Sequence, residues 1–383
     1  MGLSVCPKNK CAGCMACADI CPAGAVTVED RVLNMEAVIN ETACLHCDLC
    51  RKVCQNHEPP ALKSPLFWKQ GWAADETVRA SSSSGGFAAA IMSRFIRDGG
   101  YVCSCVFREG AFVFDVASSI DEINDFKGSK YVKSSPAGAY RQVKDLLSQG
   151  KKVLFAGLPC QAAAMKNYCR GRDENLYIVD LVCHGSPSLK VLSSFLKGKK
   201  ADPKDLRDIT FRAVDAYPGG EEIRLTPDGI EDYYTSLFMD AVTYTDNCYE
   251  CRYAAFERVS DLTLGDAWGS ELPVQERKKG ISLALCMTPK GEELLDGADL
   301  FLTDVDIEKV KKINKQLCHP AVKPSGHDMV LAGIAKGKSF DSMVRKLRPA
   351  QYGKDRIKTL LGSAGLYKRE GLFRRFRVRI VKK

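Results

Sequence analysis

Eight cysteines near the N-terminus form two runs of identical spacing. Residues 11–21 and residues 44–54 each read C-x-x-C-x-x-C-x-x-x-C. Three thiolates two residues apart can bind three corners of one iron–sulfur cubane from a single tight loop, whereas the fourth iron must be reached by a cysteine from elsewhere. The spacing therefore predicts iron–sulfur chemistry, which is the transfer of single electrons.

The duplication predicts two [4Fe–4S] clusters, because the fourth cysteine of each such run crosses to the other cluster. The ligands assigned to one cluster, the first cysteine set, are Cys11, Cys14, Cys17 and Cys54. The ligands assigned to the other, the second cysteine set, are Cys21, Cys44, Cys47 and Cys50. Structural zinc is usually held by paired cysteines, and two runs of four fit it poorly. The ninth thiol, Cys6, has no place in the pattern and is expected to be a free surface cysteine.

The elements around these runs suit a small ferredoxin domain. Residues 24–39 alternate in polarity like a short hairpin, as that fold requires. Prolines at 59, 60 and 65 then mark its end. We expect a 2[4Fe–4S] ferredoxin domain at 1–62, an α/β domain at 63–340 and a basic tail at 341–383, so that the whole chain is of the α+β class.

Four further cysteines lie at positions where they can meet. Residues 151–155 and 176–182 read as buried parallel strands of a β-α-β unit, with Cys160 and Cys183 just after their carboxyl ends, where open α/β sheets bind ligands. Cys248 and Cys251 form a later C-x-x-C pair. The four can close a third [4Fe–4S] site. Buried thiols, half a zinc site or a redox dithiol are the alternatives.

Hydroxyls and glycines at residues 81–86 precede a helix expected at 87–97. A helix N-terminus with free backbone N–H groups suits a phosphate or the pyrophosphate of a dinucleotide, and an ordinary N-cap is the alternative. Residues 101–107 and 112–117 are expected to form a hairpin. Cys103 and Cys105 share one face of its first strand and are expected to pack in the core.

Composition and charge narrow the class of protein. The chain has 383 residues, 18 cysteines and a net charge of +9. Residues 364–383 alone hold eight Lys and Arg against one Glu, so a general nucleic-acid surface is not expected. Many cysteines without an apolar leader or spanning segment indicate a cytoplasmic protein. The basic and aromatic tail from residue 366 suits either peripheral contact with an anionic membrane or a solvated, partly disordered segment.

Six motifs in order resemble one family. They are SSGGF at 83–87, GSKYVKS at 128–134, GLPCQ at 157–161, DLVCHG at 180–185, YTDNCYECR at 244–252 and SDLTLGDAWG at 260–269. Together they resemble the family of coenzyme F420 hydrogenase/dehydrogenase beta subunits, including its bacterial members with a fused ferredoxin domain. The resemblance implies a flavin, usually FAD, beside a [4Fe–4S] cluster. Electrons would then move between a partner such as ferredoxin and a two-electron acceptor.

The resemblance also implies roles for individual residues. The third cysteine set, a name we use for Cys160, Cys183, Cys248 and Cys251, becomes the ligand set of the third cluster. Ser83, Gly85 and Gly86 become contacts of the flavin phosphate. Lys130 and Tyr131 lie near the isoalloxazine, where a cation stabilises the reduced flavin.

Two further positions are candidates on their own placement in the sequence. His184 is either a proton donor or a core histidine. Asp266 and Trp268 either line the cofactor cleft or form a turn beside it. Two other functions stay open for the chain: an electron-transfer subunit of a larger complex without a substrate of its own, and a structural cluster protein of surface-polysaccharide metabolism.

Overall fold

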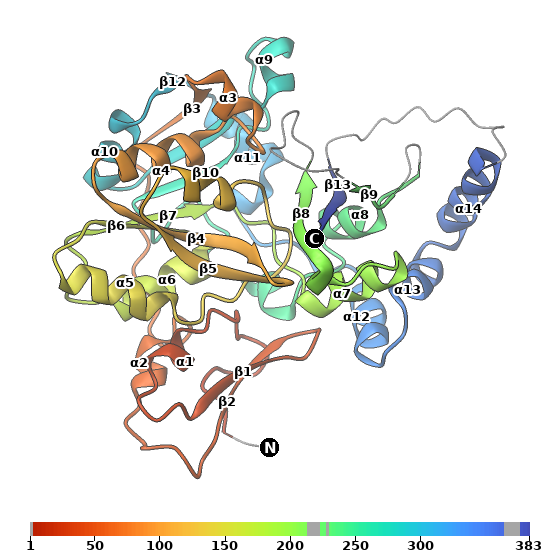
Figure 1. Cartoon of the computed structure of the whole chain (residues 1–383), viewed down its shortest axis with the longest axis horizontal. Coiled ribbons are helices and arrows are strands. Elements are labelled where there is room, and N and C mark those ends of the chain that lie inside the picture. The colour runs from red at the N-terminus through yellow and green to blue at the C-terminus, as the bar shows by residue number, and fades with distance from the viewer. Residues whose placement is uncertain (1–2, 213–222, 227–229, 364–375) are drawn as a thin grey trace.

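The computed structural model describes residues 3–212, 223–226, 230–363 and 376–383. A small N-terminal domain contains α1 (Ala16–Ile20), β1 (Val26–Asp30), β2 (Met35–Ile39) and α2 (Leu49–Val53). The two strands pair antiparallel, which confirms the expected hairpin. Figure 1 shows this domain in red below the main sheet, where its helices pack against α5 and α6.

The main domain is built on an eight-stranded mixed sheet. Its strands are β3 (Phe67–Ala73), β4 (Tyr101–Arg108), β5 (Ala111–Ala117), β6 (Val153–Gly157), β7 (Leu176–Leu181), β10 (Leu262–Asp266), β11 (Ser282–Cys286) and β12 (Leu300–Thr303). Their order is β12-β3-β11-β10-β7-β6-β4-β5. The four neighbours β10, β7, β6 and β4 run parallel, and antiparallel strands flank them on both sides. The predicted β-α-β unit and the hairpin of β4 and β5 are thus present.

Helices cover both faces of this sheet, because its central strands are apolar on both sides. One face packs on α5 (Ala139–Ser148) and α6 (Pro159–Tyr168), and the other packs on α4 (Phe87–Arg97) and α10 (Pro289–Gly297). The remaining helices around the sheet are α3 (Glu76–Ala80), α9 (Val274–Lys279) and α11 (Ile307–Ile313). The α5 and α6 face shares its apolar core with the N-terminal domain, so the two domains are packed as one body.

A second, three-stranded antiparallel sheet lies beside the first, with β13 (Phe376–Lys382) between β8 (Leu206–Arg212) and β9 (Ile223–Arg224). The helices around it are α7 (Leu189–Gly198), α8 (Tyr233–Met239), α12 (His327–Ala335), α13 (Phe340–Leu347) and α14 (Pro349–Ser363). No helix in the described ranges has the length and apolar composition to cross a bilayer.

The expectation of a solvated tail is wrong for the last strand. Val378 and Ile380 are 0% and 1% exposed, because alternate residues of β13 face the core while the strand pairs on both edges. The helices α13 and α14 likewise continue the main domain past residue 340. The remainder of the expected tail, 364–375, lies outside the described residues, as does most of 213–229.

Candidate functional site

The eight N-terminal cysteines gather around two small cavities. One cavity is lined by the first cysteine set and the other by the second cysteine set, so the cysteines group in the crossed arrangement assigned from the spacing. The loops that carry them begin their short helices at Met15 and Asp48, both with left-handed backbones (φ 63° and 60°). This tight turn lets successive thiols point inward from one loop.

The two sets differ in burial. In the first set Cys11, Cys17 and Cys54 are 7–8% exposed, because the main domain covers them. In the second set Cys47 is exposed, and the neighbouring Leu45 leaves 66% of its surface open. A group held by the second set would therefore face solvent, and one held by the first set would face the main domain.

Cys6 is not the free surface thiol that the sequence suggested. It is 5% exposed and lines the same cavity as the first set, where Asn56 Nδ2 donates to its Sγ at 3.2 Å. Hydrogen bonds to Cys11 and Cys54 raise the pKa of the Cys6 thiol. The same hydrogen bonds lower the pKa of both partners. Cys6 is thus a hydrogen-bond donor beside the first set.

The third cysteine set also comes together in space. Cys160 lies in the first turn of α6, Cys183 follows β7, and Cys248 lies in the 3-10 turn Asp246–Glu250, which Cys251 caps. The four interact electrostatically with one another. Burial raises the pKa of Cys160 to about 12 and raises that of Cys183 and Cys251 as well.

This donor set fits a metal cluster. Four thiols close enough to repel one another would ionise in such a place only beside a strong positive charge, and bound iron supplies one. The described cysteines form no disulfide, which leaves all four sulfurs free to bind.

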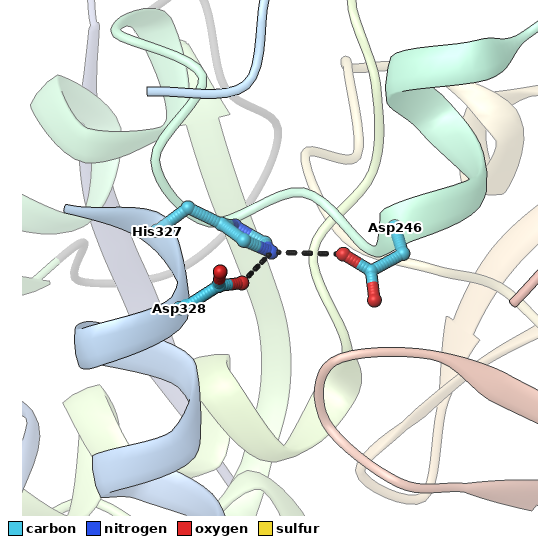
Figure 2. Close-up of side chains that lie close together, drawn as sticks. All are labelled: Asp246, His327 and Asp328. Carbon is cyan, nitrogen blue, oxygen red and sulfur yellow. Dashed lines mark hydrogen bonds and ion pairs between the residues drawn. The ribbon is translucent and has the colours of Figure 1, made fainter. Parts of the chain in front are cut away.

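A buried histidine fixes the loop that carries Cys248. His327 Nε2 lies 3.2 Å from Asp246 Oδ1, and its Nδ1 lies 3.0 Å from both Val242 O and Tyr249 OH. Figure 2 shows Asp246 and Asp328 both joined to the same ring nitrogen of His327, Nε2. The three residues have the geometry of a metal site. However, Lys323 Nζ already forms ion pairs with both carboxylates, at 2.9 and 2.7 Å, and we interpret the cluster as a structural contact that holds the loop in place.

A cavity of about 300 Å³ opens at the carboxyl ends of the parallel strands. It runs from the serine-rich turn before α4 to the loop after β7. Among the residues that line it are Ser83, Gly86, Lys130, Tyr131, Cys183, His184, Asp266 and Trp268. Because Cys183 belongs to the third cysteine set, that set lies directly at the wall of the cavity.

The N-terminus of α4 faces this cavity. Gly86 begins the helix in a left-handed conformation (φ 90°) and no side chain caps it, so the first N–H groups are open toward the cavity. Ser83 Oγ accepts from the backbone N–H of Ser129 at 2.9 Å and keeps its own proton to donate. Gly85, by contrast, is not among the lining residues. A Cβ there would lie 2.5 Å from Gly71 O, so this glycine permits close packing on β3 instead.

Two cationic side chains also line the cavity. Lys130 Nζ donates to Phe126 O and Lys127 O at 2.7 and 2.8 Å, and burial lowers its pKa. Arg212 Nη1 lies 2.8 Å from Asp266 Oδ2, and burial leaves 5% of the arginine side chain exposed. The lining of the cavity therefore combines a helix N-terminus with fixed cations.

His184 follows Cys183 in the sequence and lies beside it at the wall of the cavity. Its ring meets Trp268 edge-on at 5.3 Å between centroids, and burial lowers its pKa. Both residues line the cavity, and a role of His184 as a proton donor stays a prediction. Cys103 is fully buried as expected, whereas Cys105 is only partly buried and lines the cavity.

Sequence reasoning missed Arg212 and Lys133. Arg212 ends β8, which packs beside β4, so only the tertiary fold brings it to the cavity. Lys133 lies in a motif that was singled out for its neighbours Lys130 and Tyr131. Its ammonium instead reaches Ala12 O in the N-terminal domain at 3.1 Å. No pattern in the sequence around Arg212 or Lys133 predicts either contact.

Comparison with known proteins gives two family matches. Residues 150–313 match the family described as the C terminus of the coenzyme F420 hydrogenase/dehydrogenase beta subunit, and residues 10–57 match a 4Fe-4S dicluster domain. The F subunit of the F(420)H(2) dehydrogenase of Methanosarcina mazei is 25% identical over 284 residues, which is 68% of this chain and 78% of that protein.

A solved structure of the F420-reducing [NiFe] hydrogenase complex from Methanosarcina barkeri contains a chain with 17% identity and a TM-score of 0.45. The match covers 82% of this chain and 97% of that one. The matched families account for both the N-terminal cysteine runs and the segment with Cys160, Cys183, Cys248 and Cys251. Residues 150–313 are therefore similar to the C terminus of coenzyme F420 hydrogenase/dehydrogenase beta subunits, and the chain carries a 4Fe-4S dicluster domain at residues 10–57.

Proposed function

We propose that this chain is an iron–sulfur flavoprotein oxidoreductase. It would take electrons from a one-electron donor such as ferredoxin and deliver them in pairs to a second acceptor. Three [4Fe–4S] clusters supply one-electron transfer, and a bound FAD supplies the conversion between single electrons and a hydride. The balance is two electrons from two donor molecules, with a proton from solvent, for each acceptor reduced by hydride.

One observation carries the proposal: Cys183 belongs to the third cysteine set and also lines the cavity. A cluster bound by that set and a flavin bound in the cavity would then be neighbours, as electron transfer between them requires. The placement of the three sets suits a chain of electron carriers. The second set includes the exposed Cys47, three members of the first set are buried against the main domain, and the third set belongs to the main domain itself.

The lining of the cavity suits a dinucleotide flavin. The uncapped N-terminus of α4, an 11-residue helix, offers N–H groups and a positive dipole end to a pyrophosphate. Ser83 and Gly86 would bind there. Lys130 and Tyr131, which also line the cavity, would contact the isoalloxazine, and the lysine would favour the anionic reduced form of the ring.

His184 and Asp266 complete the proposed site. The imidazole of His184 stands at the cavity wall next to Cys183 and would hold the proton that accompanies the electron pair. Asp266 keeps Arg212 in place at 2.8 Å and so orients a second cation toward the cavity. The acceptor is a small molecule that enters the cavity or a partner protein that docks over it.

The test is a cofactor analysis followed by reductive titration. Anaerobically purified protein should release one flavin per chain on denaturation. Reduced ferredoxin should then bleach the flavin band at two electrons per flavin beyond those taken up by the clusters. Protein that retains no flavin after reconstitution with FAD and with FMN would overturn the proposal, whereas a flavin that reduced ferredoxin cannot reach would require another donor.

A second function has support of its own. The relative from Methanosarcina mazei is named as a subunit, so this chain would also work as an electron-transfer subunit that passes electrons to a partner enzyme. Turnover distinguishes the two functions. The isolated chain with ferredoxin and a small acceptor such as coenzyme F420 should be active in the first case, and inactive without its partner in the second.

A further inference from the structure

A polar junction lies between the first and third cysteine sets, where the N-terminal domain meets the main domain. Lys133 is partly buried there, and its Nζ donates to the carbonyl oxygen of Ala12, the residue after Cys11. Its backbone N–H donates to Pro187 O at 2.8 Å, on the loop that follows Cys183. The ammonium interacts electrostatically with Cys11 of the first set. It also interacts with three members of the third set, Cys160, Cys183 and Cys248.

A second group at this junction is a buried hydroxyl. Tyr140 is fully buried on α5, in the apolar core shared by the two domains. Its OH has no hydrogen-bond partner within the described part of the chain. Cys14 of the first set and Cys160 of the third both act on it electrostatically. A buried donor without a partner is costly, and sulfur atoms of a bound cluster would satisfy it.

We propose that Lys133 and Tyr140 form an electrostatic junction that raises the reduction potentials of the centres bound by the first and third cysteine sets. Adding an electron makes a cluster more negative, so a fixed positive charge and a donated hydrogen bond both favour the reduced state. One charge near two centres shifts both of their potentials in the same direction, so that both accept electrons more readily. The third centre in this proposal rests on the proposed function, whereas the first rests on the dicluster domain.

The alternative is that Lys133 only holds the two domains together. The fold offers other contacts for that task. Asp19 Oδ1 and Oδ2 accept from the Gly138 N–H at 2.8 Å, and Arg141 Nη2 donates to Asp19 O at 2.8 Å. Ser188 Oγ donates to Asp30 Oδ2 at 2.7 Å. Loss of Lys133 should therefore leave the domains docked and the clusters bound.

The experiment is an anaerobic potentiometric titration of the holoprotein, followed by electron paramagnetic resonance. It compares wild type with Lys133→Met, Lys133→Arg and Tyr140→Phe, and with Lys336→Met at an exposed site on the end of α12 as the charge-matched control. The centre bound by the second set is an internal standard, because no member of that set is among the cysteines acting on Lys133.

Lys133→Met should lower the midpoint potentials of the first and third centres and leave the second unchanged. Lys133→Arg should restore most of the shift. Tyr140→Phe should give a smaller shift of the same sign, because it removes one hydrogen bond donated to a cluster and removes no charge. Unchanged potentials in Lys133→Met protein with full iron content would overturn the inference.

Iron content separates this failure from failure of the proposed function. An iron content of only about eight per chain in wild-type protein would exclude the third centre, and the proposed function would fail with it. The effect of Lys133 on the first centre would still be measured in that protein. A shift there would uphold the junction for one centre, and its absence would overturn it.

Discussion

Both carboxylate oxygens of Asp19 accept from the backbone N–H of Gly138, each at 2.8 Å. Asp19 belongs to α1 in the N-terminal domain, and Gly138 begins α5 in the main domain, so this contact places a carboxylate at a helix N-terminus across the domain boundary. Tyr168 and Arg141 add hydrogen bonds to the Asp19 carbonyl. The first cysteine set is held against the main domain by this contact.

Asp19→Ala should loosen the two domains. The change removes charge-assisted hydrogen bonds at a site 8% exposed, and we expect a loss of about 2 kcal/mol from domain docking. Limited trypsin digestion at Lys63, which is exposed in the linker, measures the effect. Asp48→Ala removes an exposed carboxylate from the second cysteine loop and should digest like wild type. Equal digestion of Asp19→Ala and wild type would contradict the docking role.

Gly86→Ala should reduce flavin binding. A side chain at this left-handed position strains the backbone and meets Ala73 Cβ at 3.1 Å, which disturbs the start of α4 at the cavity. Gly99→Ala is the matched control, since its φ of +82° carries the same strain but nothing lies within 4 Å. Flavin per chain after gel filtration checks this. Equal losses in both variants would mean that strain alone, and not the cavity, is responsible.

Lys130→Met should lower the midpoint potential of the bound flavin. The ammonium lines the cavity, and its removal takes away positive charge that stabilises the anionic reduced ring. Spectroscopic redox titration against reference dyes measures the potential, with Lys338→Met, an exposed lysine, as the control. A midpoint potential that rises or does not change would show that Lys130 does not stabilise the reduced isoalloxazine.

His327→Phe should weaken the third cysteine set. The histidine is fully buried, and its loss leaves Asp246 and Val242 O without their ring partner, at a cost of about 2 kcal/mol. Because Asp246 begins the turn that carries Cys248, iron should be lost from the third set first. His319→Phe changes an exposed histidine and should keep its iron. Iron loss confined to the dicluster domain would refute this coupling.

Spacing predicted the parts of the protein that local geometry decides. The spacing within each cysteine run determines how its first three thiols gather around one loop. The duplication of the run predicts that Cys21 and Cys54 each join the cluster of the other run. The β-α-β pattern likewise placed Cys160 and Cys183 at neighbouring strand ends. The flavin contacts came from a family resemblance, and one of them, Gly85, packs on β3 outside the cavity.

Contacts that depend on distant segments could not be predicted in this way. Arg212 reaches Asp266 because β8 packs beside the main sheet, and Cys6 is buried because the N-terminal segment folds over the first set. The alternation of Val378 and Ile380 with arginines is a strand pattern, but its basic residues also suit a tail. Only pairing of β13 with β8 and β9 decides between the two.

The most direct test of the account is the iron and sulfide content of anaerobically purified Cys183→Ser protein beside wild type. Three clusters predict about twelve irons per chain in wild type and about eight in the variant. Cys169→Ser, which changes a fully buried cysteine outside all three sets, should keep about twelve. About eight irons in all three proteins would contradict the third cluster and leave the electrons of the dicluster domain without a neighbouring centre at the cavity.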